Sequence, residues 1–188
     1  MTRPEHSSQV DNSGDDYTDS YEDVSMFTLS GDREQTLLDK QTECTFMWTT
    51  SAGDPVGVIM NFVFHDGAFW LTCTRRRKRV PAIEARPRVA VAITSRGTDI
   101  GISQAVTYKG NAEVLDDPAT LAWFYPVLAA KVRPGNETAQ AAFAAHLDSP
   151  GRVVIRIEPD GRIGFDSEAM FANSPAGATS TLAPGAKV

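Results

Sequence analysis

The feature that most constrains the fold is a pair of apolar, strand-like segments joined by a very short turn. Residues 56–64 and 68–74 are rich in β-branched and aromatic side chains, which favour strands. The residues between them, His65-Asp66-Gly67, contain an Asp-Gly pair, which is a strong hairpin signal. We therefore expect an antiparallel hairpin, in whose register Asn61 would lie opposite Thr72.

The rest of the chain predicts more short strands and a few helices. Asp117 and Pro118 mark a helix start, Pro126 is expected to bend or break that helix, and Gly110 is expected at a bulge. Because most strands are joined by short turns, we expect a largely antiparallel sheet. Six or seven strands would favour a closed barrel, which leaves no exposed edges, with helices packed outside. Strands are expected over 44–50, 88–94, 105–115, 152–158 and 162–165, and helices over 32–40, 80–86, 118–132 and 137–147.

Charge and composition divide the chain into one domain and two tails. Seven of the 24 acidic residues but only one of the 18 basic residues lie in 1–30, so the remainder is neutral. We expect a disordered acidic tail over 1–26, a domain over 27–171 and a flexible tail over 172–188. Two cysteines, no secretion signal and no membrane-spanning run indicate a cytoplasmic protein.

Five consecutive cations, Arg75-Arg76-Arg77-Lys78-Arg79, lie between an expected strand and an expected short helix. Cations at such a junction predict an anion site, because a helix start adds unpaired N–H groups and partial positive charge. The anion could be a cofactor phosphate or a nucleic acid, or the run could simply be solvated. A neutral body argues against nucleic acid, whose binding needs many phosphate contacts.

The order of these motifs resembles the pyridoxamine 5'-phosphate oxidase-like split β-barrel family. The resemblance is carried by Phe69-Trp70-Leu71-Thr72-Cys73-Thr74, the basic run, Ala85-Arg86-Pro87, Arg88-Val89-Ala90-Val91 and the strand around Gly110-Asn111-Ala112-Glu113-Val114. It implies a split β-barrel with flanking helices. It also implies a homodimer with cofactor sites at the subunit interface.

The same resemblance implies an oxidoreductase that uses FMN, or alternatively the deazaflavin coenzyme, for hydride transfer with a small organic substrate. The arginine and histidine that bind pyridoxamine phosphate in the true oxidases have no counterpart here, which argues against that substrate. A non-catalytic flavin, haem or tetrapyrrole binding protein remains the alternative. The implied cofactor-binding residues are Asn61, Phe62, Thr72, Cys73, Thr74, Arg77, Lys78 and Arg79, with Lys78 as the main phosphate ligand.

No residue is assigned a catalytic role from the sequence, and no metal site is expected. His6, His65 and His146 are far apart in the sequence and lack the spacing of metal ligands. Cys73 has no neighbouring histidine that could activate it as a nucleophile. Trp48 and Trp123 could line the substrate space, although buried aromatic residues more often belong to the core. We expect neither a nucleic-acid nor a membrane partner.

Overall fold

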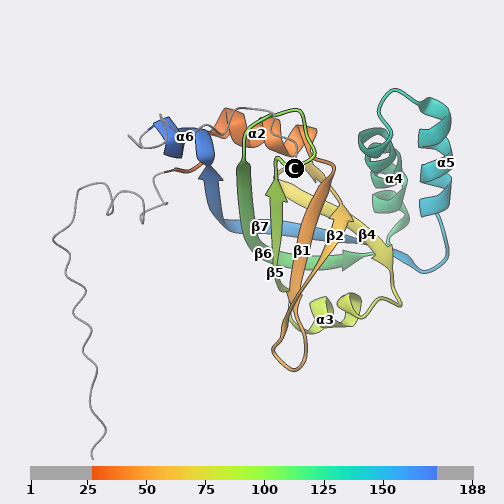
Figure 1. Ribbon diagram of the computed structural model, residues 1–188. Coiled ribbons are helices and arrows are strands. Elements are labelled where there is room, and N and C mark those ends of the chain that lie inside the picture. Colours follow the sequence, from red (N-terminus) through yellow and green to blue (C-terminus); the bar gives the residue numbers. More distant parts are fainter. Residues whose placement is uncertain (1–26, 173–188) are drawn as a thin grey trace, which may run out of the picture.

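The computed structural model describes residues 27–172. The acidic tail expected over 1–26 lies outside the described residues, as does the expected C-terminal tail except for Ala172. Within the described part, one antiparallel sheet of seven strands curls into a half-barrel in the order β2-β1-β5-β6-β7-β4-β3 (Figure 1). This confirms the predicted mainly-β split barrel with flanking helices. The expected closure is not found in the described part, where β2 and β3 form the two edges of the sheet. The strands are β1 (Glu43–Thr49), β2 (Pro55–Asn61), β3 (Val63–His65), β4 (Ala68–Thr74), β5 (Arg88–Thr94), β6 (Gln104–Leu115) and β7 (Arg152–Asp166).

Helices lie around the sheet rather than within it. Figure 1 shows α2 and α6 at one end of the barrel, α3 at the opposite end, and the α4–α5 pair standing to one side. No helix among residues 27–172 is long and apolar enough to cross a membrane. The helices are α2 (Gly31–Lys40), α3 (Arg79–Ala85), α4 (Pro118–Val132), α5 (Glu137–Leu147) and α6 (Ser167–Ala172).

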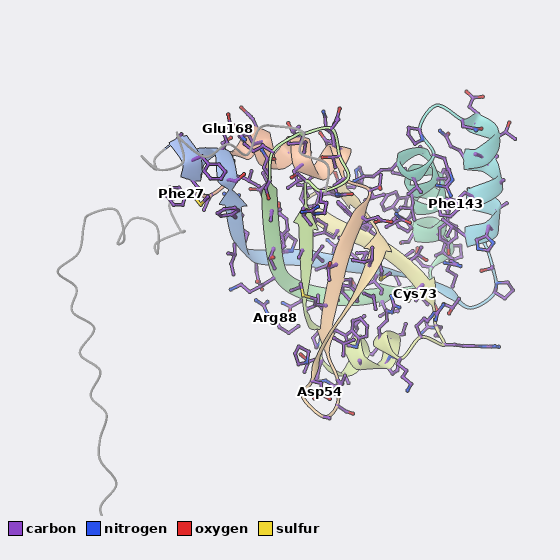
Figure 2. All side chains as sticks on the ribbon, viewed as in Figure 1. Phe27, Asp54, Cys73, Arg88, Phe143 and Glu168 are labelled. Atoms are coloured by element: carbon purple, nitrogen blue, oxygen red, sulfur yellow. The ribbon has the colours of Figure 1, made fainter. Side chains whose placement is uncertain are left out.

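Two apolar clusters hold these parts together. Alternate residues of the strands fill the barrel interior, where Phe46, Phe69 and Leu71 are completely buried. A second cluster joins α4 and α5 to the outside of β3, β4 and β7, with Phe124 and Leu128 at its centre. Figure 2 shows side chains filling both spaces. Burial of each such side chain contributes roughly 1.5–3 kcal/mol, so the second cluster fixes the helix pair against the sheet.

The predicted hairpin forms, but its register does not extend as far as expected. Asp66 and Gly67 have φ of 49° and 73°, as the tight turn requires, and Val63 pairs with Trp70. Asn61, however, pairs with Glu43 of β1 instead of Thr72. The segment divides at Phe62, which is fully buried and donates its backbone N–H to Thr42 O at 3.2 Å. With Phe62 buried at this point, the chain ends its pairing with β1 at Asn61 and begins pairing with β4 at Val63.

The end of the chain forms one long strand where two were expected. Residues 159–161 do not turn; β7 continues through them and pairs with β6 on both sides. The register shifts between Lys109 and Gly110, as the predicted bulge requires, and a Cβ on Gly110 would lie 2.2 Å from Glu158 O. The bulge accommodates Pro159, which has no N–H to donate.

Helix α4 also differs from expectation, because it continues through Pro126 without a break. An interior proline costs about 3 kcal/mol. The buried side chains on either side of it, Phe124, Tyr125 and Leu128, each regain about 1.5–3 kcal/mol by packing on the sheet. Tertiary packing therefore outweighs the local preference. The helix begins as predicted, with Asp117 accepting from Thr120 N at 2.9 Å.

Candidate functional site

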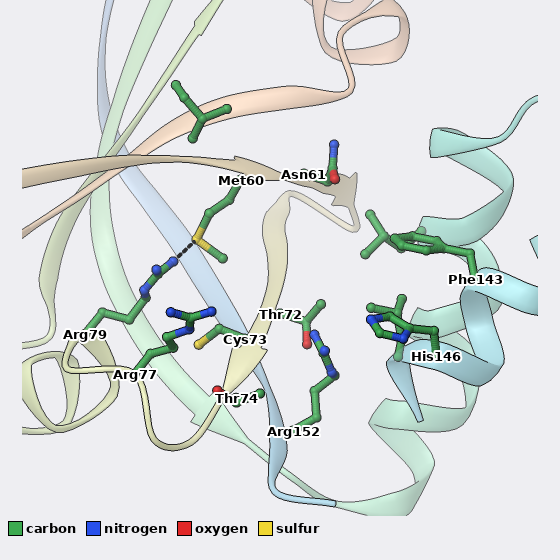
Figure 3. A pocket seen from close by; sticks show the side chains of 13 residues that line it. Met60, Asn61, Thr72, Cys73, Thr74, Arg77, Arg79, Phe143, His146 and Arg152 are labelled. Atoms are coloured by element: carbon green, nitrogen blue, oxygen red, sulfur yellow. Dashed lines mark hydrogen bonds between the residues drawn. The ribbon is translucent and has the colours of Figure 1, made fainter. Parts of the chain in front are cut away.

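A cavity of about 310 Å³ lies where the ends of β2 and β4, the basic loop and α5 meet. Six of the eight residues proposed from the sequence line it together (Figure 3). The cavity brings β2 and β4 to one site although they are not paired with each other at this point. Those six residues are Asn61, Thr72, Cys73, Thr74, Arg77 and Arg79.

The other two proposed residues lie elsewhere. Phe62 is completely buried in the barrel core, where its ring is 5.7 Å from that of Phe69. Lys78 is exposed at the N-cap of α3 and does not line the cavity. The position of Phe62 between Asn61 and Val63 makes it the anchor that holds Asn61 at the cavity. The position of Lys78 places its charge near the basic loop but outside the cavity wall.

Along β4, side chains alternate between the barrel core and the outer face that packs toward α4. Thr72 lies on the same face as Trp70, which packs toward α4, while Cys73 points into the barrel core and is 7 % exposed. Thr72 Oγ1 donates to Val153 O at 2.8 Å, and Asn61 Nδ2 donates to Thr42 O at 3.1 Å. Both polar side chains are therefore held in place by the backbone of a neighbouring segment.

The arginines of the basic run have two kinds of surroundings: one forms ion pairs within the chain, and two line the cavity. Arg75 turns away and forms ion pairs with Glu84 at 3.2 Å and Asp116 at 2.6 Å. Arg77 and Arg79 turn toward the cavity. The Arg79 guanidinium lies 5.4 Å from the centre of the Trp48 ring and 2.7 Å from Met60 Sδ. Partial burial lowers the pKa of Arg79 from its ordinary value, but a guanidinium keeps its proton in proteins.

The opposite wall comes from residues that the sequence analysis did not select. Phe143, His146 and Leu147 line the cavity from α5, and Arg152 lines it from the first position of β7 (Figure 3). Asn136 caps the start of α5 by accepting from Ala139 N at 3.0 Å. The spacing i, i+3, i+4 places the three α5 residues on one helix face, and this was the only signal in the sequence that could have grouped them.

The cavity is strongly electropositive. Among residues 27–172, it is lined by Arg77, Arg79, Arg152 and His146 but by no aspartate or glutamate. Within residues 27–172, neither Arg77 nor Arg152 forms an ion pair with a carboxylate. Burial raises the pKa of Cys73, although the positive charges of Arg79, Arg152 and Arg77 act in the opposite direction. The arrangement suits an anionic ligand and leaves Cys73 a neutral thiol.

Comparison with known families agrees with this architecture. The family model described as Pyridoxamine 5'-phosphate oxidase matches residues 34–163. The chain belongs to this family. No curated protein matches the sequence. The matched residues contain β1 to β6 and most of β7, and with them every strand that borders the cavity.

Solved structures show the same family fold at low sequence identity. The protein Rv2991 from Mycobacterium tuberculosis is 17% identical, with a TM-score of 0.66 over 77% of this chain and 89% of that one. A structure described as F420 Reductase is 22% identical, with a TM-score of 0.53 over 69% and 94% of the two chains. A FAD-binding protein from Mesorhizobium loti is 18% identical, with a TM-score of 0.52 over 73% and 93%.

The two tryptophans and the histidines considered in the sequence analysis occupy different places in the structure. Trp48 supports Arg79, whereas Trp123 packs edge-on against Trp70, with 4.8 Å between the ring centres, outside the cavity. Among residues 27–172, no group of three or more His, Cys, Asp or Glu side chains is placed to hold a metal ion. His146 is the one histidine of the described part that lines the cavity, where Arg152 lies near it (Figure 3).

Proposed function

We propose that this protein is an oxidoreductase that binds FMN, or alternatively the deazaflavin coenzyme, in the electropositive cavity. The observation that carries the proposal is the convergence of Arg77 and Arg79 on a cavity that no acidic residue of 27–172 lines. A phosphate dianion requires two or three charge-assisted donors, and these two guanidinium groups can supply them. The family match supports a flavin-type ligand, as do neighbours described as F420 Reductase and FAD-binding.

Each residue of the cofactor site would have a distinct part. Arg77 and Arg79 would hold the phosphate, and Lys78 would add positive charge outside the cavity wall. Along β4, the side chains of Thr72 and Thr74 would face the ring system and its polyol chain, and Cys73, whose side chain points into the barrel core, would contribute its backbone. Asn61 would contact the ring from the end of β2, and Phe62 would keep Asn61 in position. The surplus of arginines would also suit the longer anionic tail of the deazaflavin, so the choice of FMN rests on its single phosphate.

The bound cofactor would accept or donate a hydride, which is chemistry that a protein side chain does not supply. The chain's own residues would bind and orient the cofactor and exclude water from one side of it. No carboxylate of the described part of the chain lines the cavity, and burial raises the pKa of Cys73 and favours its neutral thiol. We therefore assign binding and orientation, and no acid–base step, to the cofactor-site residues of this chain.

We further propose that a second copy of the chain completes the site. An uncharged row crosses the outer face of the sheet, where Ile59 and Ile163 are 63% and 64% exposed at its two ends. Ile59 also lines the cavity, whose volume of about 310 Å³ is at the low end for a ligand site. A partner covering this face would both bury the row and deepen the cavity. Pairing aligns Ile59, Thr45, Ala92, Thr107 and Ile163 in the row.

Light scattering tests the assembly. The unaltered protein is expected to have twice the mass of one chain. Lysines introduced at both ends of the row, Ile59→Lys with Ile163→Lys, should give monomers, because two desolvated charges oppose association. Lysine at Val127, which is 41% exposed on α4, provides the control and should leave the mass unchanged. A monomeric unaltered protein would refute the dimer.

Cofactor titration tests the function. Purified protein is titrated with FMN and with the deazaflavin coenzyme, and binding is followed by the change in cofactor fluorescence. We expect micromolar or tighter affinity for one of them. When the bound cofactor is first reduced with dithionite, an electron-accepting substrate should speed its reoxidation. Absence of micromolar binding of either cofactor would overturn the proposal. Binding without turnover on any small organic substrate would favour the non-catalytic alternative.

A further inference from the structure

The electropositive cavity has two cationic ends that come from different parts of the chain. Figure 3 shows Arg77 and Arg79 entering from the basic loop, and Phe143 and His146 entering from α5 on the opposite side. Arg152 enters below His146, from the start of β7. The cofactor phosphate needs only the loop end. The α5 end, with one guanidinium and one imidazole, is therefore left for a different group.

Arg152 is held rigidly for such a role. It pairs with Thr74 in the ladder between β4 and β7, so its backbone belongs to the sheet. Its Nε donates to Ser149 Oγ at 3.3 Å, and its backbone N–H donates to Ser149 O at 3.2 Å. The remaining guanidinium donors have no protein acceptor in the described part of the chain. A positioned guanidinium with unused donors is preorganised for an anion.

Other arginines of the same strand emphasise the difference. Arg156 bonds to Glu158 at 2.5 Å, and Arg162 pairs with Glu34. Each of these arginines meets a carboxylate supplied by the chain itself. Arg152 lies on the same strand, half-buried and beside the cavity, but meets none among residues 27–172. The carboxylate that satisfies Arg152 would then come from a ligand.

Resting on the proposed function, we propose that Arg152 and His146 bind the carboxylate of an apolar organic-acid substrate. A single planar guanidinium fits a carboxylate through two parallel hydrogen bonds, whereas a phosphate dianion needs the two arginines of the loop end. Phe143, Leu128 and Leu147 line the same end, so the body of the substrate is apolar and a planar ring could stack on Phe143. The substrate class is an aromatic or aliphatic carboxylic acid.

The test uses 4-fluorobenzoate and its neutral analogue 4-fluorobenzamide as ligands. Fluorine NMR reports their binding to the full-length protein, both free of cofactor and loaded with FMN. We expect fluorobenzoate to bind at least about tenfold more tightly than fluorobenzamide, because a hydrogen bond to a charged group outweighs one to a neutral group. Equal binding of the acid and the amide would overturn the proposal.

Variants then place the carboxylate. Arg152→Gln is expected to weaken fluorobenzoate binding by about tenfold or more and to leave fluorobenzamide unchanged. Arg156→Gln is the matched control on the same strand and should change neither affinity. His146→Ala lies on an exposed helix position and should weaken the acid alone by about threefold, even where Arg152→Gln impairs folding. Fluorobenzoate binding that both cavity variants leave intact would refute the assignment.

The two proposals fail separately in this design. A protein that binds no flavin but binds fluorobenzoate through Arg152 would refute the cofactor proposal and support the carboxylate site. A protein that binds FMN but does not distinguish the acid from the amide would support the cofactor proposal and refute the carboxylate site. Loss of FMN binding on Arg152→Gln, with unchanged fluorobenzoate binding, would reassign Arg152 to the cofactor and overturn the inference.

Discussion

The two ends of this molecule use the same kinds of charged side chain in opposite ways. At the α2–α6 end, Arg33 meets Asp166 at 2.8 Å and Lys40 meets Asp99 at 2.8 Å. At the cavity, Arg77 and Arg152 meet no carboxylate within the described residues. A cation that already has a partner contributes to folding, whereas one that lacks a partner is available to a ligand. Substitutions at the two ends should therefore affect different measurements.

The largest effect is expected at Arg33, whose ion pair stabilises the fold. The Asp166 side chain is only 3% exposed, so Arg33→Gln would leave a buried carboxylate without its cation. That loss costs on the order of 3 kcal/mol of unfolding free energy. Urea unfolding measures the change, and FMN affinity should stay the same. Lys40→Gln, which removes an exposed pair, serves as control and should cost below about 1 kcal/mol. Equal losses in the two variants would contradict the distinction.

The next effect is expected at the cavity and on a different quantity. The double variant Arg77→Gln with Arg79→Gln should weaken FMN binding about 100-fold, because two charge-assisted phosphate contacts are lost. Its unfolding free energy should change little, since neither side chain has an ion-pair partner among residues 27–172. Lys78→Ala, outside the cavity wall, should weaken binding less. A double variant that binds FMN normally would show that the phosphate lies elsewhere.

Lys131 sharpens the comparison, because within residues 27–172 it forms no ion pair with a carboxylate and yet serves the fold. Its Nζ donates to Leu38 O at 2.8 Å and lies 4.0 Å from the centre of the Phe62 ring. Burial lowers the pKa of Lys131 to about 8. Through its contact with the ring, Lys131 supports Phe62. Phe62 is the residue after which the chain stops pairing with β1 and begins to pair with β4.

The lowered pKa of Lys131 predicts the direction of a pH effect. Between the folded pKa of about 8 and the ordinary value of 10.5, the unfolded chain binds more protons than the folded one. Lys131 should therefore contribute a rise in the unfolding free energy with pH, on the order of 1 kcal/mol between pH 8 and 9.5. The buried thiols of Cys44 and Cys73, whose pKa values burial raises, act in the opposite direction over the same range. Urea titrations at several pH values should therefore show that Lys131→Met loses this upward contribution, so that its unfolding free energy falls relative to that of the original protein as the pH rises. An identical pH dependence in the two proteins would contradict the role of Lys131.

Much of the fold could be predicted because its signals are local. The Asp66-Gly67 turn, the Asp117 cap and the Gly110 bulge each depend on a few neighbouring residues, and all three are confirmed. The continuous helix through Pro126 could not be predicted, because burial on the sheet outweighs a local preference. For the same reason, the division of the strand at Phe62 depends on which neighbours bury that ring.

In the cavity, too, the residues grouped by local sequence could be predicted and those brought in by long-range packing could not. Residues near the basic run share one strand and loop, so their grouping was accessible from the sequence. His146 reaches the cavity because the α4–α5 pair docks on the outside of the sheet, and Arg152 reaches it because β7 pairs with β4. No local pattern in the sequence reports either contact. Likewise, the five consecutive cations gave no sign of which would find acidic partners. Glu84 and Asp116, which select Arg75, lie nine and 41 positions further along the chain.

The smallest effect is expected at Arg75, inside the basic run itself. Its partners Glu84 and Asp116 are 49% and 64% exposed, and exposed ion pairs contribute between 0 and about 1 kcal/mol. Arg75→Gln should therefore lower the unfolding free energy by about 0.5 kcal/mol and leave FMN affinity within about twofold of the original. Fluorescence titration and urea unfolding check both values. A large loss of cofactor affinity would mean that adjacent cations of the run act together, and that pairing within the chain does not separate folding from binding.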